Sequence, residues 1–366
     1  MSKKHYIDTD VYTEAKKRIK HIIDIFDNVV VCFSGGKDSL CVLNLVQECY
    51  DEMGITQKVK VIFRDEELIP DDVVNFVQDI YKSGKYDFRY YAIPLESNKF
   101  VLGKTYRYVQ WDRNRKWLRS PPDFAIRLKD NEYHEYSQYD ADSFICKDIK
   151  GKIALINGIR ADESLVRLQA CMNKLNENYI NATKDPRIKI CKPIYDWSEQ
   201  DIFLYFYQKK IKYCAIYDMQ TINGDGLRVS TPLHAESSKR FYKLKTLYPN
   251  YYQQFVNIFP EMLTHSIYYN EIEKKSNFGE YPHNFDGIRQ YILEKITDSK
   301  MQALALKRVN QAEQTRINKM KTKSGAENYG GYNVLYVFNQ IANGNFKRAL
   351  MPKSKLNQEE IAYENS

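Results

Sequence analysis

Residues 34–39 bring together groups that bind phosphate. They read Ser-Gly-Gly-Lys-Asp-Ser and follow an apolar segment at residues 29–33. Glycine has no Cβ atom, so Gly35 and Gly36 let backbone N–H groups approach a ligand closely. Lys37 adds a positive charge, the serines add hydroxyl donors, and a helix starting here would point its N-terminus at an anion. The segment predicts a nucleotide site with phosphates on this turn.

A second block could also bind an anion. Residues 158–164 read Gly-Ile-Arg-Ala-Asp-Glu-Ser, and Arg167 follows. Asp162 is predicted to cap a helix, which would place Arg160 at a strand tip and Arg167 in the first turns of the helix. Two guanidinium groups beside a phosphate loop form a fork for phosphate or sulfate oxygens. On these residues alone, pairing of both arginines with Glu163 and other surface acids is an equal alternative.

The elements that must position these residues alternate between strand and helix. Strands are predicted at residues 29–33, 59–63, 88–93, 153–159 and 188–193, and helices from the glycine turn to about residue 50 and at residues 71–81. Strands separated by helices predict an α/β fold with a doubly wound, mainly parallel sheet. Such sheets bind ligands at the carboxyl ends of their strands, which would bring residues 34–39, Asp65 and Arg160 to one edge.

The patterns change after about Ser230, where the chain becomes helical and rich in tyrosine and lysine. We therefore expect a nucleotide-binding α/β domain at residues 1–230 and a mainly helical domain at residues 231–366. The helical part carries no motif that indicates a chemistry.

The composition is compatible with a two-domain globular protein of 366 residues, 43% of them apolar and 28% charged. No segment approaches the roughly 20 apolar residues of a membrane span, and no signal-peptide pattern is present, so we expect a cytoplasmic protein without a membrane partner. The seven cysteines form no Cys-x-x-Cys pair, which indicates neither a disulfide framework nor an iron–sulfur cluster. The net charge of +8 suits a phosphate-rich partner and equally suits ordinary surface lysine.

The turn at residues 34–39 resembles the PP-loop of the ATP pyrophosphatase superfamily, whose members cleave between the α and β phosphates and leave an adenylyl group on the substrate. The turn, the block with Arg160 and Arg167, and residues 192–203 together resemble the phosphoadenosine-phosphosulfate (PAPS) reductase family over about residues 25–220. The resemblance implies that the loop holds the phosphates of ATP or PAPS, and that both arginines meet the anionic end of the substrate. The implied nucleotide-binding residues are Ser34, Gly35, Gly36, Lys37, Asp38, Ser39, Asp65, Arg160 and Arg167.

The chain departs from that family where the reductases carry their catalytic cysteine. Their C-terminal Glu-Cys-Gly-x-His segment is missing, and no cysteine follows Cys214. Reduction then has no thiolate nucleophile. What remains resembles a subgroup described as co-activators of prophage gene expression, which have an added helical region and act with a ParB-like or sulfiredoxin-like partner protein. Related PP-loop proteins serve in DNA phosphorothioation and antiphage defence.

Three functions stay open. The first is metal-assisted attack on the α phosphorus of ATP, with Lys37 stabilising the leaving pyrophosphate, Arg160 orienting the acceptor, and Mg²⁺ bound near Asp38 or Asp65. Lys37, Asp38 and Arg160 are its catalytic candidates, and no general base is obvious. The second is a non-catalytic, nucleotide-sensing co-activator that binds a partner protein or DNA. The third is a thiol-dependent PAPS reductase that uses Cys214.

Two basic regions could contact nucleic acid. The segment that starts at Lys99 and ends at Arg119 contains seven lysines and arginines, one acid and several aromatic residues that could stack on bases. The segment that starts at Lys300 and ends at Lys323 is basic on a helical pattern. We interpret the first as an active-site lid, because it follows the third strand. We interpret the second as a solvated helix face, with a protein or nucleic-acid interface as the alternative.

Overall fold

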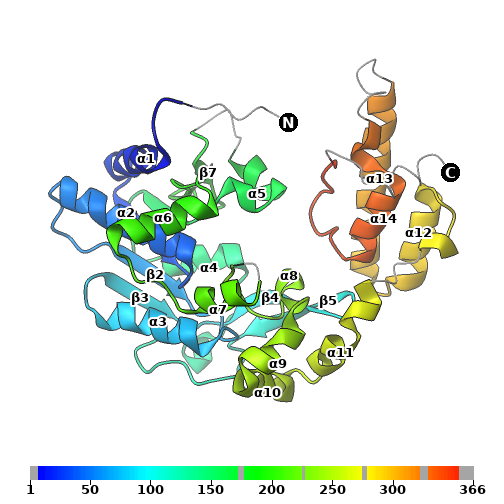
Figure 1. Ribbon diagram of the computed structural model, residues 1–366, viewed down its shortest axis with the longest axis horizontal. Coiled ribbons are helices and arrows are strands. Elements are labelled where there is room, and N and C mark those ends of the chain that lie inside the picture. The colour runs from blue at the N-terminus through cyan, green and yellow to red at the C-terminus, as the bar shows by residue number, and fades with distance from the viewer. Residues whose placement is uncertain (1–6, 172–176, 225–226, 274–277, 322–328, 354–366) are drawn as a thin grey trace. The chain divides into compact units, whose positions relative to one another are not determined.

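The computed structural model describes residues 7–171, 177–224, 227–273, 278–321 and 329–353 (Figure 1). The described residues form two compact units, the larger within His5–Lys99 and Arg107–Ile258 and the smaller within Phe100–Tyr106 and Phe259–Ser366. In the part of the chain that is described, no helix is both long and apolar enough to cross a membrane. The domain boundary expected near Ser230 stays a prediction.

The larger unit is organised around a six-stranded sheet. Its strands are β1 (Asn28–Phe33), β2 (Lys60–Arg64), β3 (Asp87–Tyr91), β6 (Ile153–Ile156), β7 (Ile180–Ala182) and β8 (Ile188–Cys191). Their order is β3-β2-β1-β6-β8-β7, and all neighbours are parallel except β7 with β8. The predicted α/β fold is confirmed. Because the chain leaves β1 for β2 on one side and later adds β6 on the other, the strand order reverses between β1 and β6, where open α/β sheets bind ligands.

Apolar clusters cover both faces of this sheet. Val31 and Phe33 of β1 pack in a cluster that includes the second helix, whereas Val30 packs on the other face with Ala141 and Ile145. This alternation gives the doubly wound arrangement that was predicted. The helices of the larger unit are α1 (Val11–Ile25), α2 (Lys37–Glu52), α3 (Asp71–Lys82), α4 (Gln138–Ile145), α5 (Leu165–Ala170), α6 (Glu199–Lys209), α7 (Ile216–Ile222), α8 (Ala235–Ser238), α9 (Leu244–Leu247) and α10 (Pro249–Ile258).

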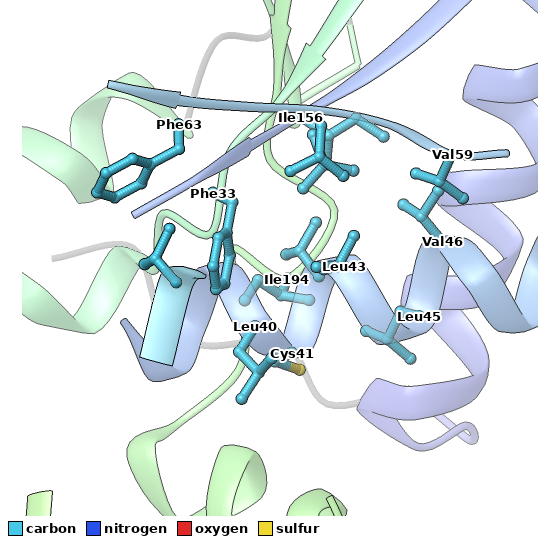
Figure 2. Close-up of a cluster of buried hydrophobic side chains, with 14 of the residues drawn as sticks. Phe33, Leu40, Cys41, Leu43, Leu45, Val46, Val59, Phe63, Ile156 and Ile194 are labelled. Carbon is cyan, nitrogen blue, oxygen red and sulfur yellow. The ribbon is translucent and has the colours of Figure 1, made fainter. Parts of the chain in front are cut away.

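The core between the sheet and α2 fixes both ends of the glycine turn. β1 is rich in β-branched valine, which favours a strand, and α2 buries Leu40, Leu43 and Val46. These side chains belong to the same cluster as Phe33 of β1 and Ile156 of β6 (Figure 2). Full burial of a leucine side chain contributes roughly 1.5–3 kcal/mol, so this packing holds the strand end, the helix start and the turn between them.

Two features of the sheet region were not predicted. β7 pairs antiparallel with β8 at the sheet edge. In addition, β4 (Leu95–Val101) and β5 (Lys104–Gln110) form a separate two-stranded sheet inside the basic segment that starts at Lys99. The density of lysine and arginine there gives no apolar alternation, so the hairpin leaves no clear periodic signal.

The smaller unit is helical, with α11 (Glu261–Glu273), α12 (Phe285–Lys295), α13 (Ser299–Met320) and α14 (Val334–Ala342). Ile288, Val309 and Phe338 belong to its apolar core. The basic helix α13 uses two of its arginines internally, because Arg308 donates to the backbone oxygen of Phe346 at 3.3 Å and Arg316 to that of Tyr332 at 3.0 Å. Lys323, the predicted end of this basic segment, lies outside the described residues.

Candidate functional site

The glycine turn adopts a backbone that only glycine accommodates at Gly35. Its φ angle is +75°, in the left-handed region that side chains disfavour. A Cβ atom there would also lie 2.7 Å from Val73 Cγ1 and 2.9 Å from Val77 Cγ2. The turn therefore packs directly on α3, and Gly36 follows as the N-cap of α2 without a side-chain cap.

The two serines of the turn fix its shape from inside. Ser39 Oγ accepts from the Ser34 N–H at 3.1 Å and donates to the Gly36 carbonyl at 3.0 Å, while the two hydroxyl oxygens lie 3.0 Å apart. The first N–H groups of a helix have no intrahelical partners. The turn thus presents the N-terminus of α2 in one preset conformation.

Lys37 is 2% exposed, and its ammonium group points toward several oxygen atoms. Nζ lies 3.0 Å from Asp38 Oδ2, 3.1 Å from the Leu227 carbonyl and 3.3 Å from Glu199 Oε2. Its backbone N–H donates to the Tyr217 hydroxyl at 2.8 Å. The Lys37 ammonium is therefore buried among these three oxygens.

Asp38 connects the turn to the block after β6. Arg160 Nε donates to Asp38 Oδ1 at 2.7 Å, and Arg160 Nη1 donates to both carboxylate oxygens of Asp162 at 2.8 Å. Arg160 is 4% exposed, so its guanidinium is largely enclosed by these acids and lies 3.5 Å from the Trp197 carbonyl. β6 ends at Ile156, so Arg160 does not lie at the strand tip predicted for it; it lies in the following loop, where it braces Asp38.

Gly158 explains why these two loops lie so close. A Cβ atom on Gly158 would lie 2.5 Å from the Asp38 carbonyl carbon and 2.7 Å from the Ser39 nitrogen. Only a residue without a side chain allows the segment after β6 to contact the first turn of α2. This contact was not predicted from the sequence.

The structure shifts the predicted helix start after β6. Asp162 does not cap α5, because residues 161–163 form a short 3-10 turn and Ser164 is the N-cap, with its Oγ accepting from the Arg167 N–H at 3.2 Å. Asp162 is instead held by Arg160. The Arg167 side chain forms an ion pair with Glu163 and is 43% exposed.

A cavity of about 570 Å³, here called the strand-end cavity, opens where β1, β2 and β6 end. This volume lies within the roughly 300–1,000 Å³ of small-molecule sites. Predicted residues that line it are Ser34, Gly36, Asp38, Ser39 and Arg167. Among the described lining residues, Gly35, Lys37, Asp65 and Arg160 do not occur. The turn thus lines the cavity directly. Lys37 and Arg160 do not line it but contact Asp38, which does.

Asp65 lies at the end of β2 as predicted but is 0% exposed. Its carboxylate pairs with the guanidinium of Arg119 and accepts from the Tyr90 hydroxyl at 2.6 Å and the Glu67 N–H at 2.9 Å. Burial, followed by the Asp65 charge, raises the pKa of Tyr90, which keeps this donor protonated. Asp65 is therefore fully engaged inside the protein.

The first basic segment, which was expected to form a lid, is anchored by ion pairs with buried acids. Arg115 pairs with the fully buried Glu67, and Arg119 with Asp65. Arg107 pairs with Glu96 and with a second acid on the surface. For Arg119, desolvation lowers and the Asp65 carboxylate raises the pKa, and the net shift is upward. Several of the segment's cations are thus neutralised within the protein.

Four further residues belong to the site without any sequence motif to mark them. Glu66, Arg228 and His234 line the strand-end cavity, and Tyr217 lines it while binding the backbone of the turn. His234 Nε2 lies 3.1 Å from Ser97 Oγ. Their positions depend on contacts between distant segments, so no local pattern could reveal them.

The block at residues 192–203 braces the larger unit. Trp197 is 2% exposed and donates from Nε1 to the Val11 carbonyl at 3.0 Å. Asp201 completes a capping box with Ser198 at the start of α6. Such a cap typically contributes about 1 kcal/mol.

Cys214 is 2% exposed, and its sulfur lies 3.6 Å from the Asp72 carbonyl. Burial raises the pKa of its thiol to about 11. Among the described residues that line the strand-end cavity, Cys32 is the cysteine present, and burial raises its pKa as well. Neither environment favours a thiolate at neutral pH.

Within the described residues, no group of three or more His, Cys, Asp or Glu side chains could hold a metal ion. Mg²⁺ at phosphate sites uses one or two carboxylates together with phosphate oxygens and water. Asp38 fits that role, because it lines the cavity and each carboxylate oxygen has a second lone pair. Asp65 does not fit, since its oxygens are buried and taken by Arg119, Tyr90 and Glu67.

The family described as "Phosphoadenosine phosphosulfate reductase domain" matches residues 28–244, more than half of the chain. The chain belongs to this family. The match covers the sheet, the glycine turn and the strand-end cavity. A curated relative, the uncharacterized protein YbdN of Escherichia coli K12, is 28% identical over 236 residues, which are 60% of this chain and 57% of YbdN. The chain thus spans little more than half of that relative.

Solved structures with similar folds are distant. Candida glabrata FMN adenylyltransferase, in complex with FMN and an ATP analogue, has 14% sequence identity and a TM-score of 0.38, covering 59% of this chain and 64% of its own. Candida auris PAPS reductase, in a phosphate complex, has 13% identity and a TM-score of 0.33, covering 56% of this chain and 84% of its own. These likenesses are too weak to carry an argument about activity.

Proposed function

We propose that this PP-loop protein binds ATP, or a related adenine nucleotide such as PAPS, in the strand-end cavity and cleaves ATP between the α and β phosphates. One observation carries the proposal. Ser34, Gly36 and Ser39 line a cavity at the point where the strand order reverses, with the N-terminus of α2 facing it. A helix N-terminus and closely approaching backbone N–H groups favour phosphate.

The chemistry follows from these positions. An oxygen of the acceptor forms a bond to the α phosphorus, the bond to the α–β bridging oxygen breaks, and pyrophosphate leaves with the electron pair. The turn and the N-terminus of α2 bind the departing pyrophosphate, and the buried Lys37 ammonium, held against Asp38, adds positive charge nearby. Donors that are already in place stabilise charge as it develops without reorganising. Arg160 has a positioning role, since it holds Asp38 at 2.7 Å.

Asp38 would hold Mg²⁺ in this site. The ion would neutralise phosphate charge when bound. Asp38 itself stays oriented by Lys37 on one oxygen and Arg160 on the other.

The direct test incubates the purified protein with Mg²⁺ and either ATP or PAPS and separates the nucleotides by chromatography. We expect AMP and pyrophosphate in equal amounts from ATP. Loss of the products in Asp38→Asn, with retention in the exposed Arg113→Gln control, would link them to this site. A protein that binds neither nucleotide would overturn the proposal.

A nucleotide-sensing co-activator is the second candidate, and one observation favours it. The Lys37 ammonium is held by Asp38, Glu199 and the Leu227 carbonyl and is 2% exposed, which suits a site that binds without turning over. In that case ATP would co-elute with the protein intact.

Partnership with a ParB-like or sulfiredoxin-like protein, and a role in regulation or antiphage defence, rest on the resemblance of the architecture. Exposed apolar side chains on α11, Leu263 at 45% and Ile267 at 61%, are compatible with a protein partner. Co-purification with the product of a neighbouring gene, with and without ATP, would test this. A thiol-dependent reductase is disfavoured by the burial of Cys214.

A further inference from the structure

A second cavity adjoins the strand-end cavity. Its volume is about 310 Å³, which is at the lower end of the roughly 300–1,000 Å³ of small-molecule sites. We call it the Met219 cavity after the half-exposed methionine that lines it. Three residues line both cavities: Arg228, Ser230 and Ser237. Ligands in the two cavities would therefore be neighbours at these three residues.

The Met219 cavity is apolar over much of its wall. Ile216 and Met219 come from α7, and Leu244 and Leu247 come from α9. Pro70 and Pro232 add further apolar surface. Such a wall binds the hydrocarbon part of a ligand.

The charged residues of the Met219 cavity all carry the same sign. Arg228, Arg240 and Lys243 line it, and no aspartate or glutamate occurs among its described lining residues. The nearby Asp72 carboxylate is engaged by the Tyr248 hydroxyl at 3.0 Å. This combination of cations and apolar surface selects a ligand with an anionic group and an apolar body.

The backbone of Arg228 is fixed at the shared wall. Its N–H donates to Gln220 Oε1 at 3.0 Å, and its carbonyl accepts from Gln220 Nε2 at 2.7 Å. Beside it, the hydroxyl oxygens of Ser230 and Ser237 lie 2.6 Å apart. Because Arg228 lines both cavities, this wall carries a guanidinium, whose planar shape matches the geometry of a carboxylate.

We propose that the Met219 cavity binds a carboxylic acid with an apolar chain, its carboxylate at Arg228 and its chain between α7 and α9, and that this acid is the acceptor of the adenylyl group. The second part rests on the proposed function. A carboxylate oxygen would form the bond to the α phosphorus while pyrophosphate leaves with the electron pair, giving a mixed acyl–phosphate anhydride. No proton has to be removed, because carboxylic acids with a pKa of about 4 are ionised at neutral pH.

Binding alone is tested by calorimetry with octanoate as the probe, compared with octan-1-ol, which lacks the charge, and butanoate, which lacks most of the chain. On the unmodified protein we expect octanoate to bind at least about tenfold more tightly than octan-1-ol, because it adds a charged contact. We expect the same minimum difference from butanoate, because octanoate buries a few more methylene groups. Equal binding of octanoate and octan-1-ol would overturn the carboxylate assignment without any variant.

Variants locate the site. Met219→Trp should fill the cavity and Arg228→Gln should remove the charge, and each should weaken octanoate at least about tenfold. The matched controls are Met53→Trp, on the exposed end of α2, and Arg113→Gln, and both should leave octanoate binding unchanged. Normal octanoate binding in a folded Met219→Trp protein would overturn the location, as would an equal loss of ATP and octanoate affinity, because the cavity would then hold part of the nucleotide.

The acceptor role is tested by adding octanoate to the ATP reaction and looking for pyrophosphate release that depends on octanoate. Octanoate binding with the expected variant pattern but no ATP binding would leave the cavity assignment standing and overturn the proposed function. ATP binding and AMP formation without any octanoate binding would overturn the inference and leave the proposed function standing.

Discussion

Two carboxylates follow neighbouring parallel strands of the same sheet, and they have opposite surroundings. Asp38, just after β1, lines the strand-end cavity while Lys37 and Arg160 hold it from behind. Asp65, just after β2, is 0% exposed and is enclosed by Arg119, Tyr90 and the Glu67 backbone. The residue types and strand-end positions are alike, yet only Asp38 has an open side.

The difference distinguishes a carboxylate that can still bind a ligand from one that only forms a structural ion pair. A buried pair needs every lone pair satisfied, because an unpaired charge in the interior is costly. An acid at a cavity keeps acceptor capacity for a ligand or metal. The predictions below test whether Asp65 is structural and Asp38 functional.

The largest effect should come from breaking the structural pair. In Arg119→Met the carboxylate of Asp65 keeps its Tyr90 and Glu67 donors but loses its counter-charge, and we expect a loss of about 3–5 kcal/mol in the free energy of unfolding, measured by urea denaturation. The exposed Arg113 of the same basic segment stacks on Tyr133 at 4.1 Å, and Arg113→Met should cost at most about 1 kcal/mol. A folded Arg119→Met protein with much weaker ATP binding would place the pair in the nucleotide site.

The glycine turn should be the next most sensitive position. Gly35→Ala combines the cost of a left-handed backbone, about 1–2 kcal/mol, with a clash on Val73 and Val77 worth about 1–3 kcal/mol. Gly84 has a φ of +63° with nothing within 4 Å of an added Cβ, so Gly84→Ala isolates the backbone cost. Equal unfolding free energies for the two variants would show that the turn is not packed on α3.

Asp38→Asn should lower ATP turnover about 100-fold, close to 2.7 kcal/mol of activation free energy, because the amide carries no charge to hold Mg²⁺. Asp65→Asn is the matched control, and it should lose stability while the turnover of the folded fraction changes by less than about twofold. Single-turnover assays with radiolabelled ATP would measure both. An inactive but stable Asp65→Asn protein would reverse the assignment of the two carboxylates.

The smallest expected effect is the reactivity of the Cys214 thiol near neutral pH. With a thiol pKa of about 11, roughly one molecule in a thousand carries the thiolate at pH 8. Alkylation of the folded protein by iodoacetamide, followed by mass spectrometry, should therefore be slow at pH 8 and accelerate as the pH rises toward 11. A folded-state pKa above the unfolded value of about 8.5 means that this thiol's contribution to stability is complete below pH 8.5 and is lost as the pH rises through 11.

If the protein were a thiol-dependent reductase, Cys214 would be reactive, which is the opposite of this prediction. Sulfite release from PAPS that disappears in Cys214→Ser, or rapid alkylation of Cys214 at pH 8, would mean that the thiol is reactive in spite of its burial. Cys171 offers a comparison, since it is also 2% exposed and burial likewise raises its pKa.

The sequence by itself determined the α/β class, the parallel strands of the main sheet, and the glycine turn with its place at a strand end. These features depend on local composition and spacing: valine-rich runs, helical periodicity and a glycine pair with Lys37 and two serines. The rule that ligands bind at the carboxyl ends of parallel strands then places the turn at the correct edge.

Only the tertiary structure decided which charged residues face the cavity. Asp65 directly follows β2 and Arg160 lies in the loop after β6, but Arg119 encloses the first and Asp38 and Asp162 enclose the second. Their partners lie up to 122 residues away in the chain. Burial and pairing are properties of such long-range contacts, so residue type and local spacing could indicate the edge of the sheet but not which side chains remain free to act there.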